Sequence, residues 1–91
     1  HIVVPHLGEN WPKDSNAAGY ISVLNKEFKV VANVGGVAPS YRADKLDTMS
    51  HSSHLFHHPH GLCSDSEGSL YVAQFASNGT WPLKFVRVAV L

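Results

Sequence analysis

Charge is scarce in this chain of 91 residues, and neither sign is in excess. Charged residues make up 15% of the sequence, and seven Lys and Arg side chains balance seven Asp and Glu side chains. Binding to a phosphate backbone or an anionic membrane needs clustered Lys and Arg, and the sequence has no such cluster. We therefore expect neither nucleic acid nor a membrane as a partner. The 44% hydrophobic content instead predicts a globular chain with a core.

Cysteine and long apolar runs are also lacking. Cys63 is the single cysteine, so no disulfide forms within the chain, and its neighbours predict a small residue in a strand. No apolar run approaches the roughly 18 residues of a membrane-spanning helix. The N-terminal stretch "HIVVPHLG" lacks the charged and long apolar regions of a signal peptide. We expect a soluble protein of unknown compartment, and the start at His1, within an apolar run, favours a processed or excised piece.

The apolar residues that are present recur with a period of two, which is typical of β-strands. Short polar connections at 25–27 and 66–68 predict two hairpins, the second with a positive φ at Gly68. The segment "RADKLDTMSHSSHLF" leaves two alternatives open, a short helix capped near Asp44 or an irregular loop. The pattern predicts six strands, at about residues 2–5, 20–25, 28–34, 60–65, 69–75 and 83–90.

Two stretches of the sequence resemble NHL repeats. From Phe56 onward, "FHHPHGLCSDSEGSLYVAQFASNGTWPLKFVRV" has the pattern of such a repeat, and its turn at 65–68 followed by "LYVA" is the most specific part. Upstream, "GYISVLNKEFKVVANVGG" is similar to the latter half of a preceding repeat. NHL repeats build β-propellers, so the resemblance implies an all-β fold made of antiparallel blades.

The expected blades are incomplete. We interpret residues 1–36 as the outer strands of one partial blade, 37–58 as an inter-blade loop and 59–91 as a second partial blade, all within one structural unit. A closed propeller needs at least about four blades, because a single blade cannot bury both of its faces. The chain is therefore predicted to be part of a larger propeller or to form a homo-oligomer. Three such chains would complete a trimeric ring of about six blades.

Five histidines lie between residues 51 and 60, and the resemblance singles out one of them. The "PHGL" at 59–62 is similar to the entry of an innermost strand in peptidyl-hydroxyglycine amidating lyases, where this histidine binds a metal ion. The resemblance therefore implies His60 as a metal ligand facing the central channel. His58 would share a side with His60 in an extended segment, whereas in a helix it would share a face with His51 and His54. The predicted ligands are His60 and His58, for a divalent ion such as Zn²⁺ or Ca²⁺. The alternatives are that all five are ordinary loop residues or that they capture metal ions only adventitiously.

Two classes of function remain open at this stage. The first is a self-assembling scaffold or binding module of the propeller type. The second is a metal-dependent enzyme, similar to an amidating lyase or a lactonase, in which His60 holds the ion against a substrate oxygen. Catalytic residues are not assigned. The remaining features are interpreted as structural: the acidic pair Asp65 and Glu67 as solvent-facing, Tyr41 and Arg42 as loop packing, Trp11 and Trp81 as packing at blade edges, and "NGT" at 78–80 as a chance glycosylation triplet.

Overall fold

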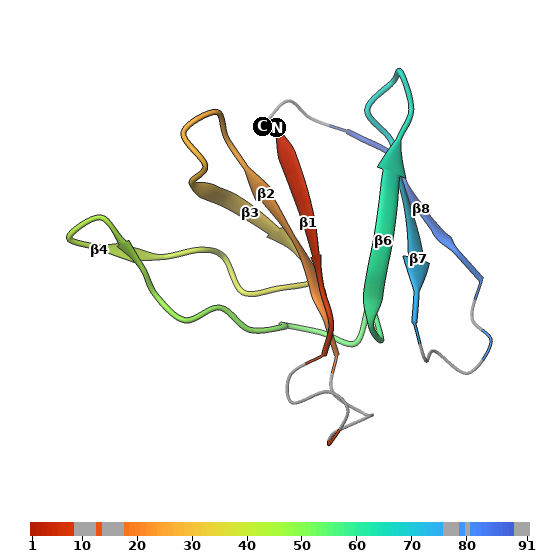
Figure 1. Cartoon of the computed structure of the whole chain (residues 1–91), viewed down its shortest axis with the longest axis horizontal. Helices are drawn as coiled ribbons and strands as arrows, with labels where there is room; N and C mark the ends of the chain where they lie inside the picture. The colour runs from red at the N-terminus through yellow and green to blue at the C-terminus, as the bar shows by residue number, and fades with distance from the viewer. Residues whose placement is uncertain (9–12, 14–17, 76–78, 80, 89–91) are drawn as a thin grey trace.

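The computed structural model describes residues 1–8, 13, 18–75, 79 and 81–88. Within these residues it contains β-strands and no α-helix, so the prediction of an all-β chain is confirmed. No helix of the described part is long and apolar enough to cross a membrane. Three antiparallel sheets form (Figure 1): a first sheet of β1 (Ile2–His6), β2 (Tyr20–Leu24) and β3 (Val30–Val34), a hairpin of β4 (Tyr41–Arg42) and β5 (Lys45–Leu46), and a second sheet of β6 (Pro59–Ser64), β7 (Leu70–Gln74) and β8 (Leu83–Phe85).

The segment from residue 42 to 56 forms a hairpin and a loop, and the helix alternative does not occur there. Ala43 and Asp44 have φ angles of 47° and 63°, so both lie in the left-handed region. Two successive residues with positive φ are what a two-residue hairpin turn of type I′ requires. Asp44, which one alternative placed at a helix cap, therefore lies at the tip of the β4–β5 hairpin.

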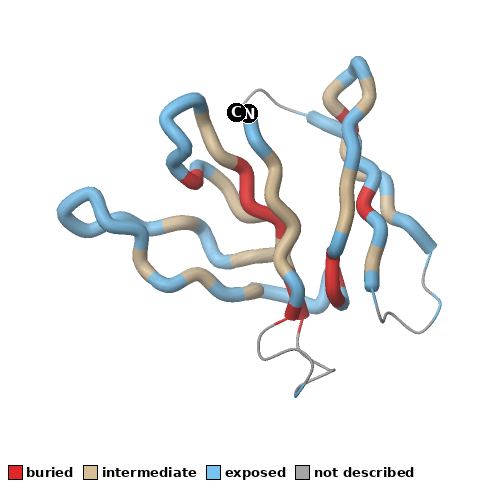
Figure 2. The backbone as a smooth tube through the Cα atoms, viewed as in Figure 1, coloured by how far each residue is buried: buried red, intermediate tan, exposed pale blue. Residues whose placement is uncertain are grey.

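The first and second sheets pack against each other through one face of each. The core between them consists of Ile21 from β2, Phe56 from the connecting segment and Val72 from β7, all nearly inaccessible to solvent. Contact between the two sheets is made mainly by β1 and β6, which lie next to each other in the middle of Figure 1. The residues packed around this core are Val3, Val34, Leu62, Leu83 and Phe85. Figure 2 shows that buried residues are confined to short stretches of the chain.

The two sheets are joined at one end by the chain around residue 57. The backbone N–H of Gly19 donates a hydrogen bond to the carbonyl of His57 at 2.8 Å. A Cβ atom at position 19 would collide with the carbonyl oxygen of His6 and the ring of Pro59. Glycine is therefore required where the start of β2 passes between the end of β1 and the start of β6.

The β2–β3 and β6–β7 hairpins use the same turn. In the first, Asn25 Oδ1 accepts hydrogen bonds from the N–H groups two and four residues later, each at 3.0 Å. In the second, Asp65 Oδ1 accepts the equivalent pair at the same distances. The fourth residue of each turn has a positive φ, 62° at Phe28 and 82° at Gly68, as predicted for Gly68. The strand expected from residue 28 begins only at Val30 because Phe28 belongs to this turn.

Replacing Phe28 with glycine is expected to stabilise the protein by about 1 kcal/mol. A left-handed conformation costs a residue with a Cβ about 1–2 kcal/mol, and the Phe28 side chain is 72% exposed, so little packing is lost. The change in the free energy of unfolding is measured by urea titration. Gly68→Ala is the matched variant, since it introduces the same backbone strain into the equivalent turn, and it should destabilise by at least as much because its Cβ would lie 3.1 Å from Cδ of Arg87. A Phe28→Gly protein less stable than wild type would contradict the strain argument.

Two expectations at the C-terminal end differ from the structure. The strand expected at 83–90 ends at Phe85 within the described residues, and positions 89 and 90 lie outside them. Trp81, expected to pack at a blade edge, is 85% exposed because no other part of the described chain covers it. Trp11, and Asn78 and Thr80 of the "NGT" triplet, fall outside the described residues.

Candidate functional site

His58, one of the two predicted metal ligands, is fully buried where the two sheets meet. Its ring Nδ1 accepts a hydrogen bond from the backbone N–H of Gly8, just after β1, at 2.8 Å. Its backbone carbonyl accepts a second bond from the N–H of Phe75, just after β7, also at 2.8 Å. His58 therefore ties the ends of β1 and β7 to the start of β6, which is a structural task.

His60, the other predicted ligand, is exposed on β6. Its ring lies 5.7 Å from the ring of Phe75, tilted by 41°. Within the described residues, no group of three or more His, Cys, Asp or Glu side chains is placed so that it would hold a metal ion. A metal site at His60 would thus need ligands from beyond this part of the chain, and metal binding by His60 and His58 stays a prediction.

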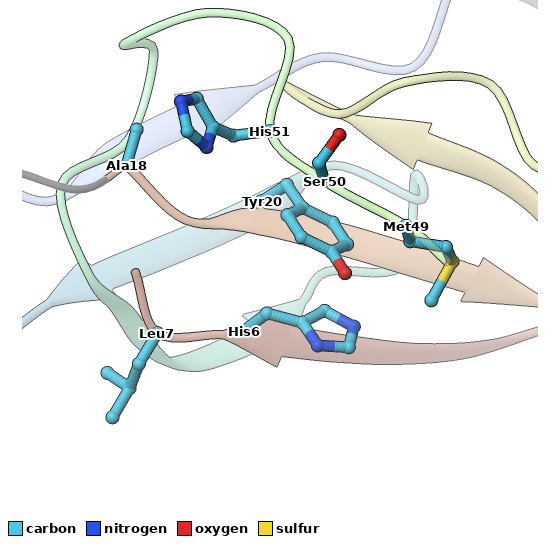
Figure 3. A pocket seen from close by; sticks show the side chains of 7 residues that line it. All are labelled: His6, Leu7, Ala18, Tyr20, Met49, Ser50 and His51. Atoms are coloured by element: carbon cyan, nitrogen blue, oxygen red, sulfur yellow. The ribbon is translucent and has the colours of Figure 1, made fainter. Parts of the chain in front are cut away.

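A cavity of about 180 Å³ lies beside the far face of the first sheet, the face turned away from the core. It is bounded by the end of β1, the start of β2 and the segment that leads from β5 toward β6 (Figure 3). The rings of His6 and Tyr20 stack on its sheet side with centroids 4.4 Å apart and planes inclined by 18°. The lining residues are His6, Leu7, Ala18, Tyr20, Met49, Ser50 and His51.

A chain of hydrogen bonds extends from His6 across the same face of the sheet. His6 Nε2 lies 2.8 Å from the hydroxyl oxygen of Ser22, which is itself 2.7 Å from Asn33 Oδ1. The amide nitrogen of Asn33 donates to the carbonyl of Val37 at 2.9 Å and lies 3.4 Å from the sulfur of Met49. Ser22 on β2 pairs with Asn33 on β3, whereas His6 on β1 pairs with Tyr20, two residues before Ser22, and reaches Ser22 diagonally on the same face.

The direction of these bonds decides what the chain of side chains does chemically. Ser22 has one hydroxyl proton, and it is donated to Asn33 Oδ1. The serine oxygen must then accept its second bond, so Nε2 of His6 carries the proton that it donates. A histidine that activates a serine nucleophile has to accept the hydroxyl proton instead. Ser22 is also only 1% exposed, so the arrangement is a structural network and not a hydrolytic dyad.

Stability is expected to fall as the pH drops below about 6.5, in part because of His6. Burial lowers the pKa of His6. Between this lowered pKa and the unfolded value of about 6.5, the unfolded chain binds more protons than the folded one. The stabilisation by neutral His6 is therefore present above pH 6.5 and lost as the pH falls through the lowered folded value. Urea midpoints of the wild type and His6→Gln from pH 8 to pH 5 test this. The variant should lose less stability on acidification, and identical slopes would show that His6 is not responsible.

Asp65 and Tyr41 have structural roles, and Asp65 is half-buried in its turn instead of facing solvent as expected. A hydrogen bond from the hydroxyl of Tyr71, at 2.9 Å, and further bonds from backbone N–H groups lower the pKa of Asp65. Glu67 is exposed. The hydroxyl of Tyr41 donates to the carbonyl of Val30 at 3.0 Å and so holds the β4–β5 hairpin against the start of β3.

Sequence reasoning did not anticipate the His6 network. His6 and Tyr20 become neighbours only because β1 and β2 pair in a specific register across a long connection. The local signal was limited to a histidine at the end of one predicted strand and an aromatic residue at the start of the next. Comparison with known proteins adds no assignment, since no family model, curated protein or solved structure matches the chain.

Proposed function

We propose that the chain is a two-sheet segment of an NHL-like β-propeller that works as a binding module once further blades complete it. The further blades would be second copies of the chain or the remainder of a longer one. The observation that carries the proposal is the pair of three-stranded antiparallel sheets, each in simple sequential order, packed face to face and in closest contact at β1 and β6. The identical hairpin turns at Asn25 and Asp65 support a repeated unit.

The solvent-accessible surface area of the chain supports the proposal that further blades complete it. A compact folded monomer of 9.9 kDa exposes about 5,200 Å². This chain exposes 6276 Å². The excess of about 1,000 Å² is comparable to the roughly 800 Å² that each partner buries in a stable protein–protein interface.

The position of apolar residues supports the same conclusion. An apolar cleft of about 470 Å³ opens between the two sheets and is lined by Val3, Val23 and Val34 on one side and by Leu70, Phe85 and Val86 on the other. β3 and β8 each pair with a single strand within the described chain, so each has an edge with unpaired backbone groups. Bare edges and open apolar clefts promote association with further strands.

The metal-dependent enzyme remains the second class predicted from the sequence, and it rests on His60 alone. Among the described residues no observation favours it over a binding module, because His60 is not accompanied by a set of metal ligands. An enzyme of this kind would need a bound metal in stoichiometric amount and would lose activity with His60→Ala. A binding module would keep its assembly in the presence of a chelator.

Solution mass by light scattering tests the proposal on the chain as given. At tens of micromolar protein, we expect a mass several times the 9.9 kDa of one chain, unchanged by a chelator. Val86→Asp, which places a charge in the apolar cleft, should reduce this mass, whereas Ser40→Asp on an exposed loop should not. A compact monomer for the wild type would contradict the proposal, and so would an equal effect of both variants.

A further inference from the structure

The segment that carries His51 and His54 is held in place by the backbone of the first sheet. The N–H of Ser52 donates to the carbonyl of Gly35 at 3.0 Å, and the N–H of Val37 donates to the carbonyl of Ser50 at 2.9 Å. Further along, the side chain of Phe56 is buried in the core at 1% exposure. These contacts hold both ends of the segment at 50–56, and so they fix the backbone from which the two histidine side chains extend.

The imidazole rings of His51 and His54 lie next to each other on this loop. Their centroids are 5.6 Å apart and their planes are tilted by 49°. His51 is half-buried at the rim of the cavity beside His6, whereas His54 is exposed. His54 therefore has room to rotate toward a common ligand without disturbing the core.

The separation of the two rings fits a shared metal ion. Zinc–nitrogen distances in proteins are about 2.0–2.1 Å, and the centre of an imidazole lies about 1.1 Å behind its nitrogen. Two imidazoles on one tetrahedral ion then have centroids about 5.2 Å apart. The observed 5.6 Å differs from this by an amount that a small side-chain rotation removes.

We propose that His51 and His54 form a two-histidine binding site for a divalent transition metal ion such as Zn²⁺ or Cu²⁺. Water or a bound ligand completes the coordination. Imidazole nitrogen suits these ions, whereas Ca²⁺ takes oxygen ligands, so calcium is not expected here. The site is independent of the propeller proposal, because both histidines belong to one loop of one chain. It also differs from the site predicted at His60 and His58, where Nδ1 of His58 is already bonded to Gly8.

Isothermal titration of the 91-residue chain with ZnCl₂ and with CuCl₂ at pH 7.5, in a buffer that does not bind metals, tests this site. We expect one ion per chain. His51→Gln and His54→Gln should each weaken binding at least about tenfold, because each removes one of two protein ligands. His57→Gln and His60→Gln are the matched controls and should leave the affinity within about twofold. Circular dichroism establishes that each variant is folded, and the exposed position of His54 keeps the test valid if His51→Gln destabilises the chain.

Three results would overturn the proposal. The first is no binding of either ion, and the second is wild-type affinity in His54→Gln. The third is a loss in His60→Gln that equals or exceeds the loss in His54→Gln, which would instead support the site predicted at His60. Nitrogen hyperfine coupling in the Cu²⁺ electron paramagnetic resonance spectrum supplies a separate readout, and two coupled imidazole nitrogens are expected.

Discussion

Replacing Phe56 with alanine is expected to lower the free energy of unfolding by about 4 kcal/mol, the largest effect of any substitution considered. Phe56 belongs to neither sheet, yet its side chain is 1% exposed and packs between Ile21 and Val72. Its ring also contacts that of Phe85 on β8, with centroids 5.3 Å apart and planes tilted by 51°. Truncation removes apolar contacts with both sheets and leaves a cavity between them.

Urea unfolding at a fixed protein concentration measures this loss, because stability depends on concentration if the chain associates. Leu55→Ala is the control. Leu55 is the apolar neighbour of Phe56 in the sequence, its side chain is 45% exposed, and its truncation should lower the free energy of unfolding by less than about 1 kcal/mol. A typical domain is stable by only 5–15 kcal/mol, so the Phe56 variant is expected to be close to unfolding. A loss below about 1 kcal/mol would show that Phe56 does not join the two sheets.

The second large effect is expected for His58→Ala, which should lower the free energy of unfolding by about 3 kcal/mol. The substitution removes a fully buried side chain and leaves the N–H of Gly8 without the acceptor that it has in the native protein. The oxygen of an asparagine side chain lies at nearly the position of histidine Nδ1, so His58→Asn should recover about half of the loss. His57→Ala, at an exposed neighbouring position, should have little effect. Equal losses for His57→Ala and His58→Ala would contradict the role assigned to the His58 ring.

Most of the strands and both hairpins, β2–β3 and β6–β7, were predictable because their signals are local. A period of two marks a strand regardless of what it packs against, and the predicted strands near 2, 20, 60 and 69 all form. Gly68 marked its turn through its conformational freedom. Phe28 has the equivalent positive φ, but a phenylalanine does not indicate one. The period of two therefore predicted a strand from residue 28, whereas β3 begins at Val30.

The relations among the histidines were not predictable, because they depend on tertiary contacts. His57, His58 and His60 are close in sequence, yet His58 is buried at the junction of both sheets while the other two are exposed. The difference arises from the long connections that bring Gly8 against this segment. His51 and His54 become neighbours because backbone bonds to the first sheet hold the loop, a constraint invisible in the sequence.

Native-state hydrogen exchange on the wild type and on Phe56→Ala tests most directly the claim that the two sheets form one unit around Phe56 and His58. The backbone amides of β2 and β7, the middle strands of the two sheets, are the ones to follow. If the claim holds, the slowest amides of both strands exchange with the same free energy of opening, and Phe56→Ala lowers that free energy equally in both. Separate opening energies for the two strands, or a loss of protection confined to one sheet, would contradict it.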